Sequence, residues 1–125
     1  MWHYNNELIK DDFIPNGYRG FVYVLKDRDT GLKYIGKKDF WCKKKGVWTE
    51  SDWRTYQGSS DITKKWVNPI KMIIAMCFKD AEMNYKEIEL QIKHDALLRD
   101  DYVNYCIGDG IKIGRIPDYM KKAAN

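Results

Sequence analysis

The chain has 125 residues, of which 44% are hydrophobic and 32% are charged. This length predicts one domain, and this composition excludes a chain that is disordered as a whole. The net charge of +4 is, by itself, only a weak indication of a polyanionic partner. The three cysteines form no Cys-x-x-Cys pair, which argues against a zinc site and favours free thiols in a reducing cytosol.

The chain shows no sequence feature of a membrane protein or of a secreted one. Its N-terminal segment is polar and lacks the apolar core of a signal peptide. The longest apolar-rich stretch, residues 70–78, is far too short to cross a membrane. We therefore expect a cytoplasmic protein without a membrane partner.

The first part of the chain predicts an extension followed by a hairpin. Residues 1–19 contain a Pro-Asn-Gly turn signal and are interpreted as an N-terminal extension. Residues 20–25 are rich in β-branched and aromatic side chains, which predicts a buried strand. A polar turn that ends at Gly31 separates this strand from a second one at residues 32–36, and two strands joined in this way pair antiparallel.

The middle of the chain predicts a loop, two short helices and a third strand. Residues 37–52 are rich first in lysine and then in tryptophan, with no clear period, which predicts a loop. Short helices are expected at residues 52–57 and near 61–67, because a serine or an aspartate precedes each one as a cap. The nearly continuous apolar run at residues 71–78 predicts a strand that is covered on both faces.

The last part of the chain predicts a long helix over residues 81–97, capped by Asp80. Its apolar positions fall at helical spacing; they are Tyr85, Ile88, Ile92 and Ala96. A loop, a short strand at 111–116 and a tail at 117–125 follow. The whole order predicts an α+β domain over residues 20–116, with a three-stranded, mainly antiparallel sheet flanked by helices.

Two tyrosines mark the predicted hairpin. Tyr23 lies on its first strand and Tyr34 on its second, eleven residues later. Across a hairpin the two phenols can lie close together on one side of the sheet, although such a pair alone is more often structural. The surrounding letters carry more information, because Phe-Val-Tyr at 21–23 is followed by Tyr-Ile-Gly at 34–36.

This pair of tripeptides resembles the two motifs that name the GIY-YIG nuclease family, where the same tyrosine spacing occurs. The second motif matches letter for letter, whereas Phe-Val stands in place of Gly-Ile at strand-filling positions of the first. Two further stretches resemble a phage-type branch of the family: Trp-x-x-Tyr-x-Gly-Ser-Ser at 53–60 and Glu-x-x-x-Gln at 87–91. The resemblance covers residues 20–107.

The resemblance implies an endonuclease that hydrolyses phosphodiester bonds in double-stranded DNA with one divalent cation, Mg²⁺ or alternatively Mn²⁺. A hard cation of this kind prefers oxygen ligands and keeps several waters. The implied catalytic residues are Tyr23, Tyr34, Arg54, Glu87 and Asn104, with Glu87 as the metal ligand. The twenty residues between Tyr34 and Arg54 exceed the spacing in compact members of the family, because the lysine-rich segment intervenes.

Each implied residue type suits the reaction. Arg54 would offer a planar, permanently charged fork to phosphate oxygens. Tyr23 would orient or deprotonate the attacking water, and Tyr34 would hold water or phosphate. A phenol with a pKa near 10 is a poor base at pH 7, so a cation such as Lys37, Lys38 or Arg54 would have to lower that pKa. Asn104 is expected to brace the site rather than react.

Two glutamates compete for the metal. Glu87 and Glu89 are two residues apart, so they point about 200° apart on a helix and only one can face the tyrosines. Glu87 is favoured, because Gln91 lies one turn later on the same face and completes the Glu-x-x-x-Gln pattern. The alternative is that Glu89 binds the metal and Glu87 is a surface charge.

Residues 37–45 contain five lysines and one acid. Such a block is usually a solvated loop, but beside a nuclease centre it predicts contacts with DNA phosphates. The lysines concerned are Lys37, Lys38, Lys43, Lys44 and Lys45. The tryptophans in and after this segment could stack on bases, although we favour the interpretation that they anchor the loop to the domain.

Two other classes of protein remain open at this stage. One is a catalytically silent module of the same fold that binds DNA through its basic segment. The other is a structural or inhibitory phage protein with no nucleic-acid role. We expect modest sequence preference, or preference that comes from a partner or from a homodimer. A phage-encoded chain would act in the cytoplasm of its bacterial host.

Overall fold

The computed structural model describes residues 1–111 and 117–123. Its main sheet has five strands in the order β2-β1-β7-β3-β4, and every pairing is antiparallel except that of β1 with β7. These strands are β1 (Trp2–Tyr4), β2 (Glu7–Leu8), β3 (Gly20–Lys26), β4 (Lys33–Asp39) and β7 (Ile70–Cys77). The α+β class is confirmed, but the sheet is larger than the three predicted strands, because β1 and β2 come from the predicted extension.

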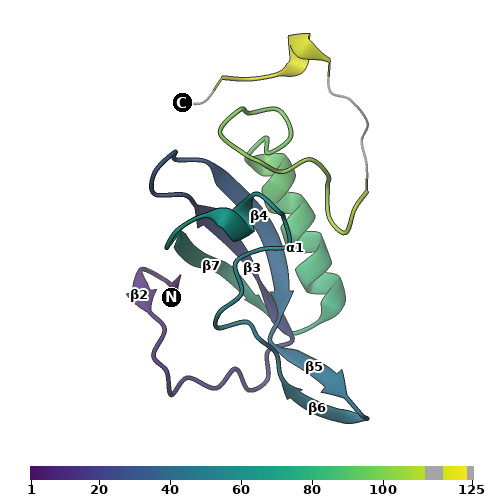
Figure 1. The fold of residues 1–125 in the computed structure, drawn as a ribbon. Coiled ribbons are helices and arrows are strands. Elements are labelled where there is room, and N and C mark those ends of the chain that lie inside the picture. The colour runs from purple at the N-terminus through teal and green to yellow at the C-terminus, as the bar shows by residue number, and fades with distance from the viewer. Residues whose placement is uncertain (112–116, 124–125) are drawn as a thin grey trace.

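Both faces of the sheet carry a packed core, as the apolar run of β7 predicted, although Ile74 within that strand is 44% exposed. Helix α1 (Asp80–Lys93) packs along one face, over a core that includes Val22, Ile35 and Met83 (Figure 1). The opposite face carries a second core, rich in aromatic rings and closed by the long connecting segments; its buried members are Trp2, Phe21, Tyr23, Leu25, Phe40, Trp53 and Ile73. Trp53 thus anchors its segment, as expected, whereas Trp48, expected to do the same, is 56% exposed.

The hairpin of β3 and β4 has the predicted antiparallel pairing. Tyr23 lies opposite Gly36, and Leu25 lies opposite Tyr34. Residues of β3 alternate between the two cores, because successive side chains of a strand point to opposite faces. Tyr23 and Tyr34 therefore lie on the aromatic face, away from α1.

The predicted loop over residues 37–52 is wrong. Strand β4 continues to Asp39, and a separate two-stranded sheet follows, made of β5 (Trp41–Lys44) and β6 (Val47–Glu50). The turn between them is Lys45-Gly46, and both residues have positive φ angles, 50° and 80°. Two such residues make the tight turn of a hairpin. The sequence does not indicate this hairpin, because asparagine or aspartate, rather than lysine, usually precedes the glycine of such a turn.

The two short helices predicted after this hairpin do not form. Ser51 and Ser60 do accept backbone N–H groups, from Trp53 and Ile62, as caps would. The turn after Ser51 does not extend beyond Gly58, which has a φ of 88°. The turn after Ser60 ends at Trp66, where the backbone becomes extended. What remains of the second helix is the 3₁₀ turn η1 (Thr63–Lys65).

Helix α1 ends at Lys93, earlier than predicted, and Asp95 beyond it has a positive φ of 53°. The predicted apolar face is wrong at two positions, since Tyr85 is 71% exposed and Ile92 is 59% exposed. The buried face consists of Met83, Glu87, Leu90 and Gln91. Two polar residues, Glu87 and Gln91, therefore face the sheet, where apolar residues were expected.

The C-terminal part holds one more short element, the 3₁₀ turn η2 (Asp118–Met120). The strand predicted at 111–116 lies outside the described residues except for Ile111, which bridges to Ile107. In the described part of the chain, no helix combines the length and the hydrophobicity that crossing a lipid bilayer requires.

Candidate active site

A pocket lies at the edge of the main sheet, where β4 meets α1 and two loops. Its lining comes from β3, β4 and α1, from the loop at 56–60 and from the loop at 104–110. Among the lining side chains are Tyr23, Tyr34, Lys37, Tyr56, Ser59, Glu87, Gln91, Asn104 and Asp109. The pocket therefore gathers polar groups from three secondary-structure elements and two loops.

The two motif tyrosines lie side by side in this pocket, which confirms the predicted geometry of the pair. Their ring centroids are 6.3 Å apart on the same face of adjacent antiparallel strands. Tyr23 is almost completely buried, with 1% of its surface exposed. Its hydroxyl reaches across Gly36, where a Cβ atom would lie 2.5 Å from that oxygen. Glycine in the second motif therefore lets the phenol reach the sheet edge.

Glu87 enters the pocket from the other side of the same edge strand. Only 5% of its surface is exposed, and its Oε1 atom is buried without a hydrogen-bond partner among the described residues. Glu89, by contrast, is exposed and forms an ion pair with Lys86 at 2.8 Å. Of the two glutamates, Glu87 is thus the one that lies near the tyrosines.

Asn104 and Gln91 hold one wall of the pocket against β4. The Asn104 amide accepts a hydrogen bond from the Ile35 N–H at 3.0 Å and donates one to the Ile35 carbonyl at 2.8 Å. Gln91 donates to the same carbonyl at 3.2 Å and accepts from the Gly108 N–H at 2.8 Å. These hydrogen bonds fix the loop at 104–110 to β4. They also explain why Gln91 is buried on α1, since both ends of its amide have a partner.

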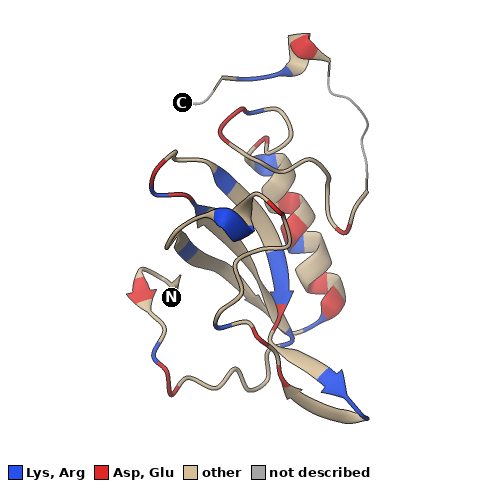
Figure 2. Cartoon of the chain, in the orientation of Figure 1, with Lys and Arg blue, Asp and Glu red and all other residues tan. Residues whose placement is uncertain are grey.

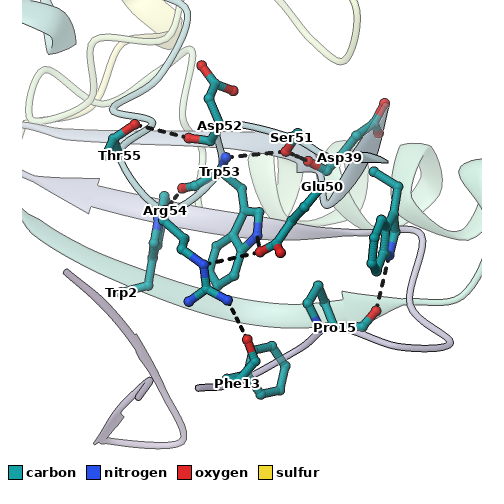
Figure 3. Close-up of polar contacts among 11 residues, drawn as sticks. Trp2, Phe13, Pro15, Asp39, Glu50, Ser51, Asp52, Trp53, Arg54 and Thr55 are labelled. Atoms are coloured by element: carbon teal, nitrogen blue, oxygen red, sulfur yellow. Dashed lines mark hydrogen bonds and ion pairs between the residues drawn. The ribbon is translucent and has the colours of Figure 1, made fainter. Parts of the chain in front are cut away.

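Arg54 does not line the pocket. Its Nε atom donates to Glu50 Oε1 at 3.1 Å, and its guanidinium also donates to the Phe13 carbonyl and lies 4.4 Å from the centre of the Trp53 ring (Figure 3). The arginine therefore ties the N-terminal segment to the start of the 51–57 turn.

The lysine block divides into two groups. Lys37 and Lys38 belong to β4 and are already paired: Lys37 with Asp109 at 2.9 Å, and Lys38 with Asp52 at 2.6 Å. The other three lie at the far end of the β5–β6 hairpin and are exposed. Only Lys37 lines the pocket.

Comparison with known protein families gives a result that agrees with this geometry. The family model described as "Putative endonuclease segE, GIY-YIG domain" matches residues 2–107, which is most of the chain. The chain belongs to the GIY-YIG endonuclease family. Neither the curated proteins nor the solved structures that were compared gave a match.

The pocket of this GIY-YIG domain contains side chains that motif reasoning missed. Tyr56 and Ser59 come from the same stretch as Arg54, so the Trp-x-x-Tyr-x-Gly-Ser-Ser pattern was the signal that could have identified them. Asp109 belongs to a Gly-Asp-Gly sequence that reads only as a turn. Its role in the pocket depends on the contact of Gly108 with Gln91, which no local pattern predicts.

Burial controls the ionisation of the pocket. It raises the pKa of Tyr23 well above the usual value, and the neighbouring Tyr56 and Tyr34 add to this shift. It also raises the pKa of Tyr34, although a hydrogen bond with Ser59 at 3.2 Å opposes the change. Both phenols therefore keep their protons at neutral pH.

The Glu87 carboxyl is shifted for the same reason. Burial raises its pKa to about 7, Lys37 acts in the opposite direction, and Asp109 adds to the increase. A buried carboxylate that lacks a partner is unfavourable, and a bound cation would relieve that cost.

The pocket fits a hard divalent cation held by one carboxylate. In the described residues, no three histidine, cysteine, aspartate or glutamate side chains gather into a metal-binding group. Mg²⁺, however, is commonly held by one or two carboxylates, with water and substrate phosphate completing its shell. The unpartnered Oε1 atom of Glu87 and the hydroxyl groups around it supply this kind of donor set.

The close approach of Tyr23 to β4 leads to a prediction for Gly36→Ala. The new Cβ atom would lie 2.5 Å from the Tyr23 hydroxyl oxygen and 2.7 Å from Cζ, so the buried ring must shift. We expect a stability loss of about 1–3 kcal/mol and a loss of any cleavage activity of up to about a hundredfold. Urea unfolding and a cleavage assay measure the two effects. Gly31→Ala has open space around the new atom but a φ of 75°, so it measures the cost of backbone strain without a side-chain clash. An active, fully stable Gly36→Ala would contradict the packing described here.

Proposed function

We propose that this GIY-YIG domain is a metal-dependent endonuclease that hydrolyses phosphodiester bonds of double-stranded DNA in the pocket beside β4. The observation that carries the proposal is the meeting of three groups at one edge strand. Tyr23 and Tyr34 reach this edge from one face of the sheet, and the buried, unpartnered carboxylate of Glu87 reaches it from the other.

In this proposal Glu87 holds one Mg²⁺ or Mn²⁺ ion. When bound, the ion supplies positive charge to the scissile phosphate and to the leaving oxygen. The Glu87 side chain is suited to this role, because the ion would compensate a carboxylate that burial otherwise disfavours.

The hydroxyl groups of the pocket would position water and phosphate. Since the pKa of Tyr23 is well above its ordinary value, this residue acts as a protonated hydroxyl that orients the attacking water rather than as a base. Tyr34, whose hydroxyl lies 3.2 Å from that of Ser59, would hold a phosphate oxygen. Asn104 keeps the loop at 104–110 on the edge strand.

Lys37 is the cation we assign to the phosphate. Its partner Asp109 has a 79% exposed side chain, and such exposed pairs contribute little stability, so a phosphate can replace the carboxylate. Arg54, the residue that the family resemblance implies, would have to leave Glu50 and the Phe13 carbonyl to reach the pocket. We therefore place Arg54 in a supporting role.

Incubation of supercoiled plasmid DNA with the protein tests this proposal. With Mg²⁺ we expect conversion to nicked or linear forms. With excess EDTA we expect intact plasmid, because EDTA removes the cation whose positive charge would stabilise the phosphate and the leaving oxygen. A chain that binds plasmid in a gel shift at low salt, yet leaves it intact with Mg²⁺ or Mn²⁺, would instead be the catalytically silent module. A chain that neither cleaves nor shifts DNA would contradict both.

A further inference from the structure

The β5–β6 hairpin extends beyond the end of the main sheet (Figure 1). Within the described residues, its two strands pair only with each other. A two-stranded hairpin is marginally stable in water by itself. Its far end nevertheless exposes large apolar side chains, since Val47 is 62% exposed and Trp48 is 56% exposed. Packing within the domain leaves more than half of each of these side chains exposed.

The same end of the hairpin carries three lysines in sequence, Lys43, Lys44 and Lys45 (Figure 2). All three are exposed, and none forms an ion pair in the part of the chain that the structure describes. Lys37 and Lys38, one strand earlier, are both paired with aspartates. The hairpin tip therefore carries three positive charges that no acidic side chain among the described residues pairs with.

Lys45 occupies a position that does not favour lysine. Its φ angle is 50°, in the left-handed region, and the following Gly46 has a φ of 80°. Asparagine and aspartate tolerate this conformation better, and Asn-Gly is the preferred pair in such a turn. A lysine here sacrifices turn stability, which points to a use for its charge.

The two faces of the hairpin combine apolar surface and charge in the same way. Lys43 lies directly opposite Trp48, with its Nζ atom 5.9 Å from the ring centre, and Lys44 lies opposite Val47. Arg19, held by Asp39 at 3.2 Å and placed 5.4 Å from the Trp48 ring, supports that ring from the body of the domain. At the tip, apolar side chains therefore lie beside positively charged side chains.

We propose that the β5–β6 hairpin enters the major groove of duplex DNA beside the cleavage site, where Val47 and Trp48 contact base edges and the three lysines contact phosphates. The inference rests on the proposed nuclease function and adds a recognition element to it. The major groove, about 12 Å wide, admits a two-stranded ribbon, and apolar side chains there distinguish thymine by its methyl group. Lysine contacts with phosphate position the ribbon but do not read sequence.

The length of the chain limits where the contacted bases lie. Nine residues separate Gly36 in the pocket from Lys45 at the tip. An extended chain of that length spans at most about 30 Å, which is less than one turn of DNA, roughly 34 Å. The preferred bases should therefore lie within about ten base pairs of the cut, on one side of it.

Selection of bound duplexes from a random library tests the inference without depending on cleavage, because it is run on the Glu87→Gln background in EDTA. We expect a short preferred sequence for the otherwise unchanged hairpin. The double substitution Val47→Ser and Trp48→Ala should remove that preference while retaining most of the non-specific affinity. Cut-site mapping with a Glu87-containing protein should place the preferred bases within about ten base pairs of the cut.

Substitution of the three lysines should change DNA binding in a different way. Replacing Lys43, Lys44 and Lys45 with alanine should weaken binding about equally across sequences and flatten the slope of log affinity against log salt by roughly 0.9 per lost contact. The matched control replaces Lys10, Lys26 and Lys93, which removes the same charge from positions outside the hairpin. Lys45→Asn should weaken binding while leaving thermal stability equal or higher.

The outcomes separate the two proposals. An unchanged selected sequence in the Val47 and Trp48 variant would overturn groove reading, and an unchanged salt slope in the triple-lysine variant would remove the tip from the interface. If the hairpin variants behave as expected but the protein with Glu87 leaves all DNA intact with Mg²⁺, the nuclease proposal fails instead. A Lys45→Asn variant that binds like the original would show that the lysine has no role in binding.

Discussion

Glu87→Gln is expected to lower the rate of Mg²⁺-dependent DNA cleavage by about a thousandfold, which corresponds to the roughly 4 kcal/mol of transition-state charge stabilisation that a bound metal supplies. The amide is a much poorer Mg²⁺ ligand than the carboxylate but has nearly the same size. A gel shift at fixed salt should show that the variant still binds DNA. Glu89→Gln is the matched control on the same helix and should cleave normally, because Glu89 is exposed and paired with Lys86.

The same substitution should have the opposite effect on stability in EDTA. Burial raises the pKa of Glu87 from 4.5 to about 7 in the folded chain. Between these two values the unfolded chain has released the proton and the folded chain still holds it, so wild-type stability falls as pH rises through this window. The loss is up to about 3 kcal/mol, and glutamine, which does not titrate, avoids it.

Urea unfolding of both proteins from pH 4 to pH 8 measures this difference. Glu87→Gln should gain on wild type as pH rises and keep its advantage above pH 7. Adding Mg²⁺ should raise the stability of wild type alone, since a ligand that binds only the folded state stabilises it. Normal cleavage by Glu87→Gln together with loss of cleavage by Glu89→Gln would contradict the assignment of Glu87.

Tyr23→Phe is expected to lower the cleavage rate by a factor of about a hundred to a thousand, because it removes the hydroxyl proposed to orient the attacking water. The ring itself remains, so the aromatic core around Trp2, Phe21 and Tyr56 should keep its packing. Single-turnover cleavage measures the chemical step, and thermal unfolding checks the fold. Tyr34→Phe should have a smaller effect, because the Ser59 hydroxyl lies beside the one that is lost.

The surface residue Tyr85 offers a control for Tyr23. It lies on α1 and is 71% exposed, so Tyr85→Phe removes a hydroxyl without touching the pocket. Since burial raises the pKa of Tyr23 well above its ordinary value, ionisation of this phenol should not contribute to the pH profile of cleavage between pH 6 and 9. Equal cleavage rates for Tyr23→Phe and Tyr85→Phe would exclude Tyr23 from the reaction.

The sequence predicts structure most accurately where the structure depends on residues that are close together in the chain. The β3–β4 hairpin follows from two apolar strands and a glycine-containing turn, and the tyrosine geometry follows from the hairpin. The parallel pairing of β1 with β7 joins Trp2 to Lys71, almost seventy residues later, and no local pattern indicates such a contact. The β5–β6 hairpin was missed, because Lys45 is atypical for its turn.

The face of α1 shows why apolar periodicity can mislead. Tyr85 and Ile92 fall at helical spacing, yet both are exposed, whereas Glu87 and Gln91 are buried. A pocket needs polar groups in protected positions. The helix therefore packs with these polar residues toward the sheet, and two of the apolar residues chosen by periodicity face solvent. The motif Glu-x-x-x-Gln identified this face correctly.

The Arg54 expectation came from the family resemblance, and the residue lies in the segment predicted as a helix at 52–57, which does not form. With only one turn after Asp52, the arginine side chain is directed to Glu50 and the Phe13 carbonyl instead of the pocket. The 56–60 loop contributes Tyr56 and Ser59 to the pocket, and its path depends on the contacts of Gln57 with two backbone carbonyls farther along the chain. Such tertiary contacts are not visible in a linear pattern.

The amide of Asn104 has a consequence for solubility. Strand β4 is one of the two edge strands of the main sheet, and an exposed strand edge invites pairing with another chain. Here Asn104 occupies both backbone groups of Ile35, and two neighbouring hydrogen bonds, from Lys33 N–H to Asp101 and from Val103 N–H to Lys33, occupy the groups next to them. The segment at 101–104 therefore shields the edge that carries the tyrosine motif. Weakening this segment would open the sheet to intermolecular pairing, so aggregation would accompany the loss of the pocket.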